Sequence, residues 1–392
     1  MYDVIVVGAR CAGSPTAMLF ARNGYRVLLL DKARFPRDTL STHYLHQPAV
    51  ARLARWGLLS AVTASNCPPI DRARHTVADI VLEGCSLPVD GHRAAYAPRR
   101  YVLDPILAAG AVAAGVEFRE HCAVEDLLFE GDRVVGVRCR TPAGVVSEER
   151  ATLVVGADGM RSLVAAKVGA AHTVSHPLMS CTYYSYWEDV PACFELFEAE
   201  GRWVGALPTN DGLTLISTYF PQSRFDHVRA DAQTAYLANI RATKPEFYER
   251  MRGGRQAERL YGTGDQQNFF RQAAGRGWAL VGDAGHHKDS ITARGISDAF
   301  LQAELLVDTV GPDLGDPTRL ERFGAERDAK LLGIYHSTLL AAGLSIAPDR
   351  LALLRAIATR QELVDCYFAT VAGACEIDDF YGMPELAEVL AF

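Results

Sequence analysis

The stretch "DVIVVGARCAGSPTAMLF", residues 3–20, decides the fold of this chain. Residues 3–8 are rich in Val and Ile, which is typical of a strand buried on both faces. A glycine turn follows, and we expect a helix from about Ala12 to Asn23. "RVLLLD", residues 26–31, is a second buried strand. The chain therefore opens with a βαβ unit, whose two strands are parallel.

The glycine turn in this unit has the features of a phosphate-binding turn. Gly8 and Gly13 occupy the first and third positions of a GxGxxG pattern, and Arg10 stands at the second. Asp31 closes the next strand, about where a carboxylate binds a ribose hydroxyl in dinucleotide-binding folds. A helix N-terminus offers N–H groups and partial positive charge to a pyrophosphate. The turn predicts a dinucleotide site, with a ligand-free strand–helix turn as the alternative. Arg10 either pairs with an anionic group or faces solvent.

Length and composition are those of an ordinary globular protein. The 392 residues suggest two or three domains, and hydrophobic and charged residues make up 49% and 22% of the chain. The net charge is −7 and the basic residues are scattered, which argues against a nucleic-acid partner. No apolar stretch reaches the length of a membrane span. The nine cysteines show no CxxC, which favours reduced thiols in a cytoplasmic protein.

The remaining chain alternates between two kinds of segment. A helix at 104–115 precedes three alternating stretches within 123–151, which predict a β-meander, and another buried strand. From about 175 to 220, short strand-like pieces carry many aromatics and predict an antiparallel sheet in a second domain. Helical sequence near 231–252 follows. "GWALVGDAG", residues 277–285, then returns the chain to a buried strand and a glycine turn, and the last sixty residues are helical.

Two further glycine turns identify a family. They are "VVGADGMRS" (154–162) and "LVGDAGHHKDSITARGIS" (280–297), and each follows a buried strand. Together with the first turn, in this order, they resemble the flavoprotein monooxygenases typified by aromatic hydroxylases. Geranylgeranyl reductase-like enzymes and flavin-dependent halogenases share the arrangement, and "FPRDTLSTH" (35–43) resembles a segment of those relatives. The resemblance covers about residues 1–310.

The resemblance implies an FAD site built from all three turns. It places the first turn at the pyrophosphate, Asp31 at the adenosine ribose, Asp283 at the ribityl chain and the helix that starts at Gly295 at the flavin ring. A helix N-terminus there stabilises the negative charge of reduced flavin by ~0.3–1 kcal/mol. The predicted cofactor-binding residues are Gly8, Arg10, Cys11, Ala12, Gly13, Asp31, Lys32, Arg37, Arg100, Val124, Asp158, Gly159, Gly282, Asp283, Gly295, Ile296 and Ser297.

The resemblance also implies the fold class and the limits of its parts. We expect an α/β protein with a discontinuous Rossmann-like FAD-binding domain that carries the β-meander, an antiparallel-sheet substrate domain and C-terminal helices. The expected boundaries are 1–68, 93–172 and 273–330 for the FAD-binding domain, 69–92 and 173–272 for the substrate domain, and 331–392 for the helical region.

The implied reaction is hydroxylation of an aromatic or polyketide-like small molecule with NAD(P)H and O2. No second GxGxxG unit is present, so NAD(P)H is expected as a transient reductant. Halogenases of the family carry a W-x-W-x-I-P element and an early catalytic lysine. Here "WVGALP" (203–208) lacks the second Trp, and no lysine lies between Lys32 and Lys167, which argues against halogenation. An alkene reductase of the geranylgeranyl type, or a non-catalytic flavin-binding scaffold, stays as the alternative.

The sequence does not assign catalytic residues. His43 and His46 are candidates for a general base toward a phenol, with a structural role as the alternative. Ser290 and Thr292 stand where the family usually has a proline and a glycine, and we expect Ser290 to leave the loop before the flavin less rigid. A metal site at the third turn is disfavoured, because adjacent side chains rarely converge on one ion. The residues considered for it are Asp283, His286, His287 and Asp289. The candidates for lining the substrate pocket are Tyr183, Tyr184, Tyr186, Trp187, Trp203 and Phe220.

Overall fold

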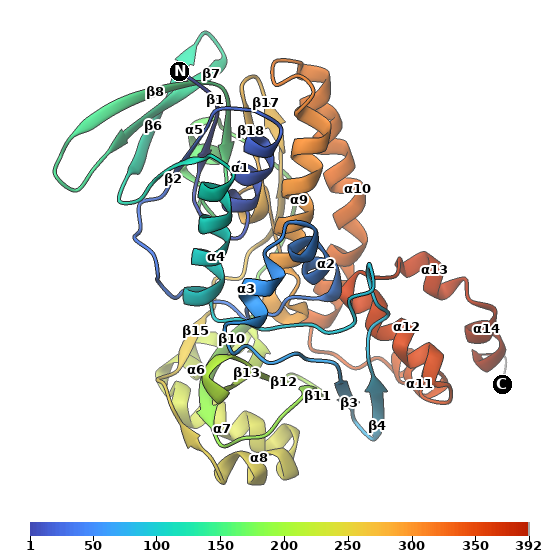
Figure 1. Cartoon of the computed structure of the whole chain (residues 1–392). Helices are drawn as coiled ribbons and strands as arrows, with labels where there is room; N and C mark the ends of the chain where they lie inside the picture. Colours follow the sequence, from blue (N-terminus) through green and yellow to red (C-terminus); the bar gives the residue numbers. More distant parts are fainter. Residues whose placement is uncertain (391–392) are drawn as a thin grey trace.

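The computed structural model describes residues 1–390, which form two large sheets and one small sheet with helices around them (Figure 1). The first sheet has the order β17-β18-β8-β1-β2-β5, with β7 and β6 continuing from β8. Strands β18, β8, β1, β2 and β5 are parallel neighbours. Their bounds are β1 Tyr2–Val7, β2 Val27–Leu30, β5 Glu117–Arg119, β6 Ala123–Glu130, β7 Arg133–Arg140, β8 Val146–Gly156, β17 Ala274–Gly275 and β18 Trp278–Leu280.

The opening βαβ unit forms as the sequence predicts. Helix α1 (Gly13–Arg22) connects β1 to β2, whose parallel register pairs Val4 with Val27 and Val7 with Leu30. Every residue of β2 is buried, because helices cover one face of the sheet and the β-meander with a short helix covers the other. The late strand β18 joins this sheet beside β8. The predicted α/β class, with a chain that returns late to the nucleotide-binding layer, is confirmed.

Strand β8 differs from its prediction. The sequence suggested a meander strand and then a separate buried strand, but the structure has one strand of 11 residues. Its first part pairs antiparallel with β7, and its second part pairs parallel with β1. Exposed and half-buried residues alternate in the first part, and burial is nearly continuous in the second. The pattern changes because the covering layers change along a single strand.

Helices cover the first sheet on the side of α1. They are α4 (Arg100–Ala113), α9 (Gly295–Val310) and α10 (Pro317–Ala342), with α2 (Gln47–Arg55) and α3 (Leu59–Thr63) at their ends. Met18 of α1, Leu107 of α4 and Phe300 of α9 lie in one core. The meander and α5 (Leu163–Lys167) close the other face, around Val137 and Val164.

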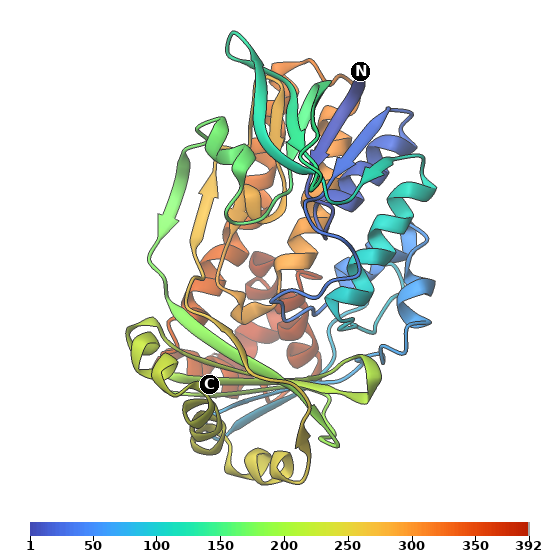
Figure 2. The ribbon, with the colours of Figure 1, turned by 90° about the vertical axis from the view of Figure 1, so that its left-hand side faces the viewer.

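The second sheet has the order β14-β10-β13-β12-β11-β3-β4, with β15 also paired to β10. The four central strands are antiparallel as predicted, whereas β3 joins β11 in parallel. Helices α6 to α8 cover its outer face, below the sheet in Figure 2. The bounds are β3 Ala73–Val77, β4 Ile80–Gly84, β10 Ser180–Glu188, β11 Phe194–Ala199, β12 Arg202–Pro208, β13 Thr214–Pro221, α6 Phe225–Ala230, α7 Ala232–Thr243, α8 Pro245–Arg252, β14 Arg255–Gln256 and β15 Tyr261–Thr263.

The C-terminal part is helical, as predicted. Helices α11 (Pro348–Ile357) and α12 (Gln361–Ala372) pack against β4, and α13 (Ile377–Tyr381) and α14 (Pro384–Leu390) follow. Helix α10 is continuous across position 330. A small third sheet joins β9 (His172–His176), β16 (Asn268–Arg271) and β19 (His286–His287). Within residues 1–390, no helix combines the length and apolarity that crossing a membrane requires.

Candidate functional site

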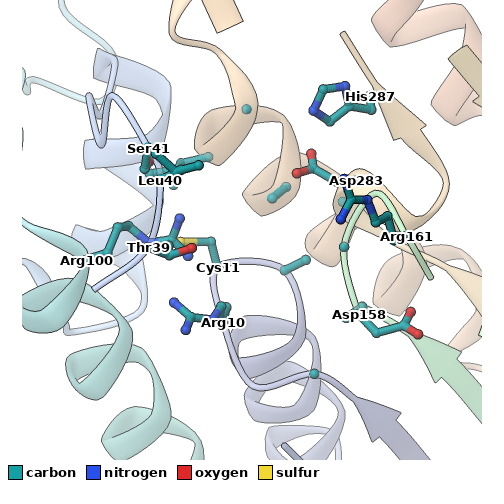
Figure 3. A pocket seen from close by; sticks show the side chains of 18 of the residues that line it. Arg10, Cys11, Thr39, Leu40, Ser41, Arg100, Asp158, Arg161, Asp283 and His287 are labelled. Carbon is teal, nitrogen blue, oxygen red and sulfur yellow. The ribbon is translucent and has the colours of Figure 1, made fainter. Parts of the chain in front are cut away.

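A cavity of about 890 Å³ opens at the carboxyl ends of the parallel strands (Figure 3). Val7 ends β1, Leu30 ends β2 and Ala157 follows β8, and all three line the cavity. The start of α9 completes the wall through Gly295. This edge of an open parallel sheet is where ligands bind in α/β folds.

The cavity brings together all but two of the residues predicted to bind a cofactor. Figure 3 shows Arg10, Cys11 and Arg100 on one side and Asp158 and Asp283 on the other. The predicted residues that line it are Gly8, Arg10, Cys11, Ala12, Asp31, Lys32, Arg37, Arg100, Val124, Asp158, Gly159, Gly282, Asp283, Gly295 and Ile296. Gly13 packs behind the first turn and Ser297 is buried in the first turn of α9, so neither lines it.

The first turn requires its glycines for two different reasons. Gly8 has φ +101°, and a Cβ there would lie 2.4 Å from the carbonyl oxygen of Ala157. A Cβ at Gly13 would lie 1.7 Å from the carbonyl oxygen of Gly8. Contacts this short are not available to any side chain. The two glycines let β1, β8 and α1 meet closely, which points the N-terminus of α1 at the cavity.

Asp31 is held rigidly at the end of β2. Its carboxylate accepts hydrogen bonds from the backbone N–H groups of Ala9, at 2.8 Å, and Ala33, at 2.7 Å. The side chain is buried, and the residue lines the cavity. Each carboxylate oxygen retains a lone pair, so Asp31 can accept a further hydrogen bond from a ligand hydroxyl.

Arg10 pairs with a buried carboxylate inside the protein. Its Nη1 lies 2.6 Å from Oδ2 of Asp104, which is fully buried on α4. Arg100 binds the same carboxylate through Nε at 2.9 Å. The side chain of Arg10, at the second glycine position, is therefore directed toward α4. Its guanidinium carbon also lies 5.5 Å from the ring centroid of Phe35. Cys11 is packed beside this group, where burial raises the pKa of its thiol, so it stays protonated.

Asp158 stabilises the second turn. Its carboxylate accepts hydrogen bonds from the hydroxyl of Ser162 at 2.5 Å and the N–H groups of Leu163, at 2.7 Å, and Val164, at 3.2 Å. Burial raises the pKa of Asp158, and these hydrogen bonds oppose that shift. The aspartate therefore binds the first N–H groups of α5 and the hydroxyl of its N-cap Ser162, and it fixes the turn that lines the cavity. Its predicted role in supporting FAD stays a prediction.

The third turn is held by hydrogen bonds where the family has proline and glycine. Ser290 Oγ pairs with the hydroxyl of Tyr219 at 2.9 Å, and its N–H donates to Gln266. Thr292 Oγ1 pairs with Thr338 of α10 at 2.9 Å. The expected loss of rigidity at Ser290 is therefore offset by side-chain bonds to β13 and α10.

Sequence reasoning missed a buried charged cluster at the start of α9. Lys288 and Arg294 both bind the carboxylate of Asp298, the latter from Nη2 at 3.2 Å. Lys288 is 7% exposed, Arg294 8% and Asp298 2%. Lys288 and Asp298 line the cavity. Burial alone would raise the pKa of Asp298, but the two cations hold it well below its usual value. The signal in the sequence was an acid four residues after Arg294, the spacing of an ion pair on a helix.

The two candidate bases are structural histidines. His43 binds the carbonyl of Ala97 through Nδ1 and the hydroxyl of Tyr186 through Nε2, both at 3.0 Å. Burial, with the charge of Arg99, lowers the pKa of His43 to about 3. Burial likewise lowers the pKa of His46 to about 3. Groups with such low pKa values are weak bases, and neither residue lines the cavity.

The aromatic candidates divide between the two faces of the second sheet. Tyr183, Trp187 and Phe220 belong to the outer core with α6 to α8, whereas Tyr184, Tyr186 and Trp203 face the other side. Alternation along a strand predicts this division, so the outer three cannot line a pocket near the cavity. Tyr44, which was not among the candidates, does line it and stacks on Phe194 at 4.4 Å.

The adjacent histidines of the third turn diverge. His286 packs on Phe270, with ring centroids 4.3 Å apart, and His287 binds the carbonyl of Gln267 through Nδ1. Within residues 1–390, no three His, Cys, Asp or Glu side chains gather in a way that would hold a metal ion. The four residues considered for a metal all line the cavity, and they are Asp283, His286, His287 and Asp289.

The residues present fit FAD. A cavity of about 890 Å³ lies in the range of cofactor sites, ~300–1,000 Å³. It has a glycine turn before a helix for the phosphates, a fixed carboxylate at Asp31 for a ribose, and the N-terminus of a 16-residue helix, α9, for an anionic ring edge. FAD would supply electron transfer, and the protein would bind and orient it and tune its electronics.

Comparisons with known proteins agree with this geometry. A tryptophan 2-halogenase from Chondromyces crocatus is 25% identical over 324 residues, which are 78% of this chain and 60% of that protein. A digeranylgeranylglycerophospholipid reductase from Methanosarcina acetivorans is 26% identical, over 76% of this chain and 72% of the other. The structure of PqsL, a probable FAD-dependent monooxygenase from Pseudomonas aeruginosa, matches with a TM-score of 0.70 at 20% identity, over 95% of this chain and 100% of PqsL.

The relatives named above are a halogenase, a reductase and a probable monooxygenase, so they differ in the reaction that they catalyse. The alignment with the halogenase spans less than two thirds of that protein's length. The family model described as "FAD binding domain" matches residues 1–330. This chain therefore belongs to that FAD-binding family and is a flavin-dependent oxidoreductase.

Proposed function

We propose that this protein is an FAD-dependent monooxygenase that uses NAD(P)H and O2 to hydroxylate a small aromatic molecule. The observation that carries the proposal is the wall of the cavity around Tyr44. Tyr44 lines the cavity. Its ring is held from behind by stacking on Phe194 and by an edge-on contact with His46, with centroids 4.7 Å apart, and neither of those two residues lines the cavity. The exposed part of the Tyr44 ring can contact a planar aromatic substrate, because aromatic pairs favour stacked and edge-on contacts.

The space beyond Tyr44 argues against a long isoprenoid substrate. The neighbouring pocket, which shares Tyr44 and lies against Phe368 and Ala372 of α12, has a volume of about 20 Å³. That volume holds about one water molecule. An alkene reductase acting on a geranylgeranyl chain needs a long apolar channel, so the small volume of this pocket favours hydroxylation of a compact substrate.

Halogenation is not favoured by the residues of this chain. The element at 203–208 lacks its second tryptophan, and Trp203 packs with Tyr219 and Ile291. No lysine lies between Lys32 and Lys167. The proposed reaction therefore transfers oxygen, and the chain's own residues bind FAD, position the ring of the substrate and exclude water.

The test is consumption of NAD(P)H and oxygen by the FAD-loaded protein across a panel of phenols and small polyketides. Oxygen uptake equal to the hydroxylated product supports the proposal. Oxidation of NAD(P)H coupled to alkene saturation without oxygen supports the reductase, and a halogenated product in the presence of bromide or chloride supports the halogenase. Tight FAD binding without turnover of any substrate supports the scaffold.

A further inference from the structure

Two clusters of charged side chains lie at the cavity, and each contains two cations and one carboxylate. In each, two cations share one buried carboxylate: Arg10 and Arg100 share Asp104, and Lys288 and Arg294 share Asp298. Each cluster therefore has one positive charge in excess. A buried excess charge is costly unless an anion binds beside it.

The first cluster has an evident anion. Arg10 belongs to the turn that precedes α1, where the two phosphates of FAD are expected. The second cluster lies elsewhere on the wall, because Asp298 is in the first turn of α9. Its excess charge therefore needs a different anion, at the helix end that is expected to face the flavin ring.

One further carboxylate acts on the second cluster without balancing it. Burial lowers the pKa of Lys288, and the carboxylates of Asp298 and Asp283 oppose that shift. Asp283 lines the cavity and also attracts Arg100 of the first cluster. The neighbouring His286 is uncharged, since burial lowers its pKa well below the usual value. Asp283 is thus shared between the two clusters and does not form an ion pair with the cations of either.

We propose that Lys288 tunes the flavin: its ammonium, left in excess because Arg294 also binds Asp298, stabilises the negative charge of reduced FAD. Reduction adds two electrons and one proton to the ring, and the single negative charge that remains would lie near the N-terminus of α9. Lys288 reaches this place by bonding to Asp298, one turn after Gly295. The proposal rests on FAD binding with its ring near α9 and is independent of the substrate.

The shared carboxylate makes a clean substitution available. In Lys288→Met, Asp298 keeps Arg294 as its partner, so the variant loses the excess charge without leaving an unpaired buried acid. In Asp298→Asn, both cations lose their partner and the positive charge increases. The two substitutions therefore change the charge near the ring in opposite directions, which a merely structural role would not do.

The experiment is the two-electron reduction potential of the FAD-loaded protein, measured anaerobically without substrate by equilibration with a reference dye. We expect Lys288→Met to weaken binding of reduced relative to oxidised FAD about tenfold, because a single charge is lost nearby. That factor corresponds to a potential about 30 mV lower. Asp298→Asn should shift the potential upward, and Lys288→Arg should keep it near the parent value.

Lys330→Met is the matched control, because Lys330 is exposed on α10 outside the cavity. It should leave the potential unchanged. If Asp298→Asn does not fold, Lys288→Gln replaces it and should follow Lys288→Met. Equal potentials in the parent and Lys288→Met, shifts of Lys288→Met and Asp298→Asn in the same direction, or a potential of Lys288→Gln equal to that of the parent overturn the inference. A protein that binds no FAD would overturn the proposed function itself.

Discussion

Arg10 and Asp104 are 94 residues apart in the chain, and their side chains meet across 2.6 Å at the base of the first turn. Arg100 binds the same carboxylate from one helical turn away. An arginine at the second glycine position is therefore compatible with a phosphate-binding turn, because a buried acid on α4 holds it. The pairing also orients two guanidinium groups at the cavity before any ligand arrives.

The first prediction concerns this shared acid. In Asp104→Asn, two arginines lose a fully buried counter-charge, so we expect the free energy of unfolding to fall by ~3 kcal/mol. FAD affinity should fall as well, because Arg10 and Arg100 lose the group that positions them. Urea unfolding and a fluorescence titration with FAD measure the two effects. Asp71→Asn, at an exposed residue, is the control. An unchanged FAD affinity in a folded Asp104→Asn protein would contradict the positioning role.

A second prediction separates Arg10 from its partner. Arg10 is about a quarter exposed in the cavity, so Arg10→Gly should weaken FAD binding and alter stability less than Asp104→Asn does. In that variant Asp104 keeps Arg100 as its counter-charge. Isothermal titration with FAD checks the expectation. If Arg10→Gly binds FAD as tightly as the parent, the arginine makes no useful contact with the cofactor.

The backbone of the first turn supports a third prediction. Gly8→Ala places a Cβ 2.4 Å from the carbonyl oxygen of Ala157 and also forces a side chain into φ +101°. Gly24→Ala is a matched control, since Gly24 has φ +88° with no atom near its Cβ position. The control should cost ~1 kcal/mol from strain alone, whereas Gly8→Ala should cost ~3 kcal/mol or more and abolish FAD binding. Thermal melts with and without FAD measure both, and equal losses in the two variants would rule out the steric argument.

The sequence predicted those parts of the site that depend on local pattern. The turn at Gly8, the acid at Asp31 and the helix after Arg294 each leave a local signature, and the structure gathers them at one cavity. Asp104 and Lys288 were missed because their meaning depends on partners in space. The continuity of β8 was missed because two burial patterns follow each other within one strand.

The division of the aromatic residues shows a different limit. Alternation along β10 separates Tyr184 from Tyr183 by face, and this was available from the sequence. The sequence did not show which face of the sheet is directed toward the cavity, because this depends on where α6 to α8 pack. The hydrogen bonds of Ser290 and Thr292 are of the same kind, since β13 and α10 are distant in sequence.

A fourth prediction follows from the buried acid of the third turn. Burial raises the pKa of Asp289 to about 6, although hydrogen bonds from Ser180 and the N–H of Ile291 oppose the shift. In the unfolded chain an aspartate titrates near ~3.9. Between these values the folded protein holds a proton that the unfolded chain has released. Stability from this group is therefore complete below pH ~4 and is lost as the pH rises through ~6.

Asp289→Asn removes this pH dependence. Between pH 4 and pH 7, the parent should lose ~2–3 kcal/mol more stability than the variant does. Urea unfolding of both proteins at the two pH values gives the difference directly, and other titrating groups cancel in the comparison. A parent and variant with parallel stability profiles would show that Asp289 is ionised at an ordinary pKa.

The last prediction tests what replaces the family's proline. The hydroxyl of Tyr219 and Oγ of Ser290 lie 2.9 Å apart, and Tyr219 is almost fully buried on β13. If this bond fixes the loop before the flavin, Tyr219→Phe and Ser290→Ala should not act independently. The double variant should be ~1 kcal/mol more stable than the sum of the single losses predicts.

The cycle has a matched control in Tyr219→Phe combined with Ser60→Ala, because Ser60 is exposed on α3. These two losses should add. Urea unfolding of the single and double variants gives the coupling energy. A titration with FAD shows whether the loop still forms its part of the cavity wall. Additive losses at Tyr219 and Ser290 would mean that the loop is held by Gln266 and Thr338 instead, through their bonds to Ser290 and Thr292.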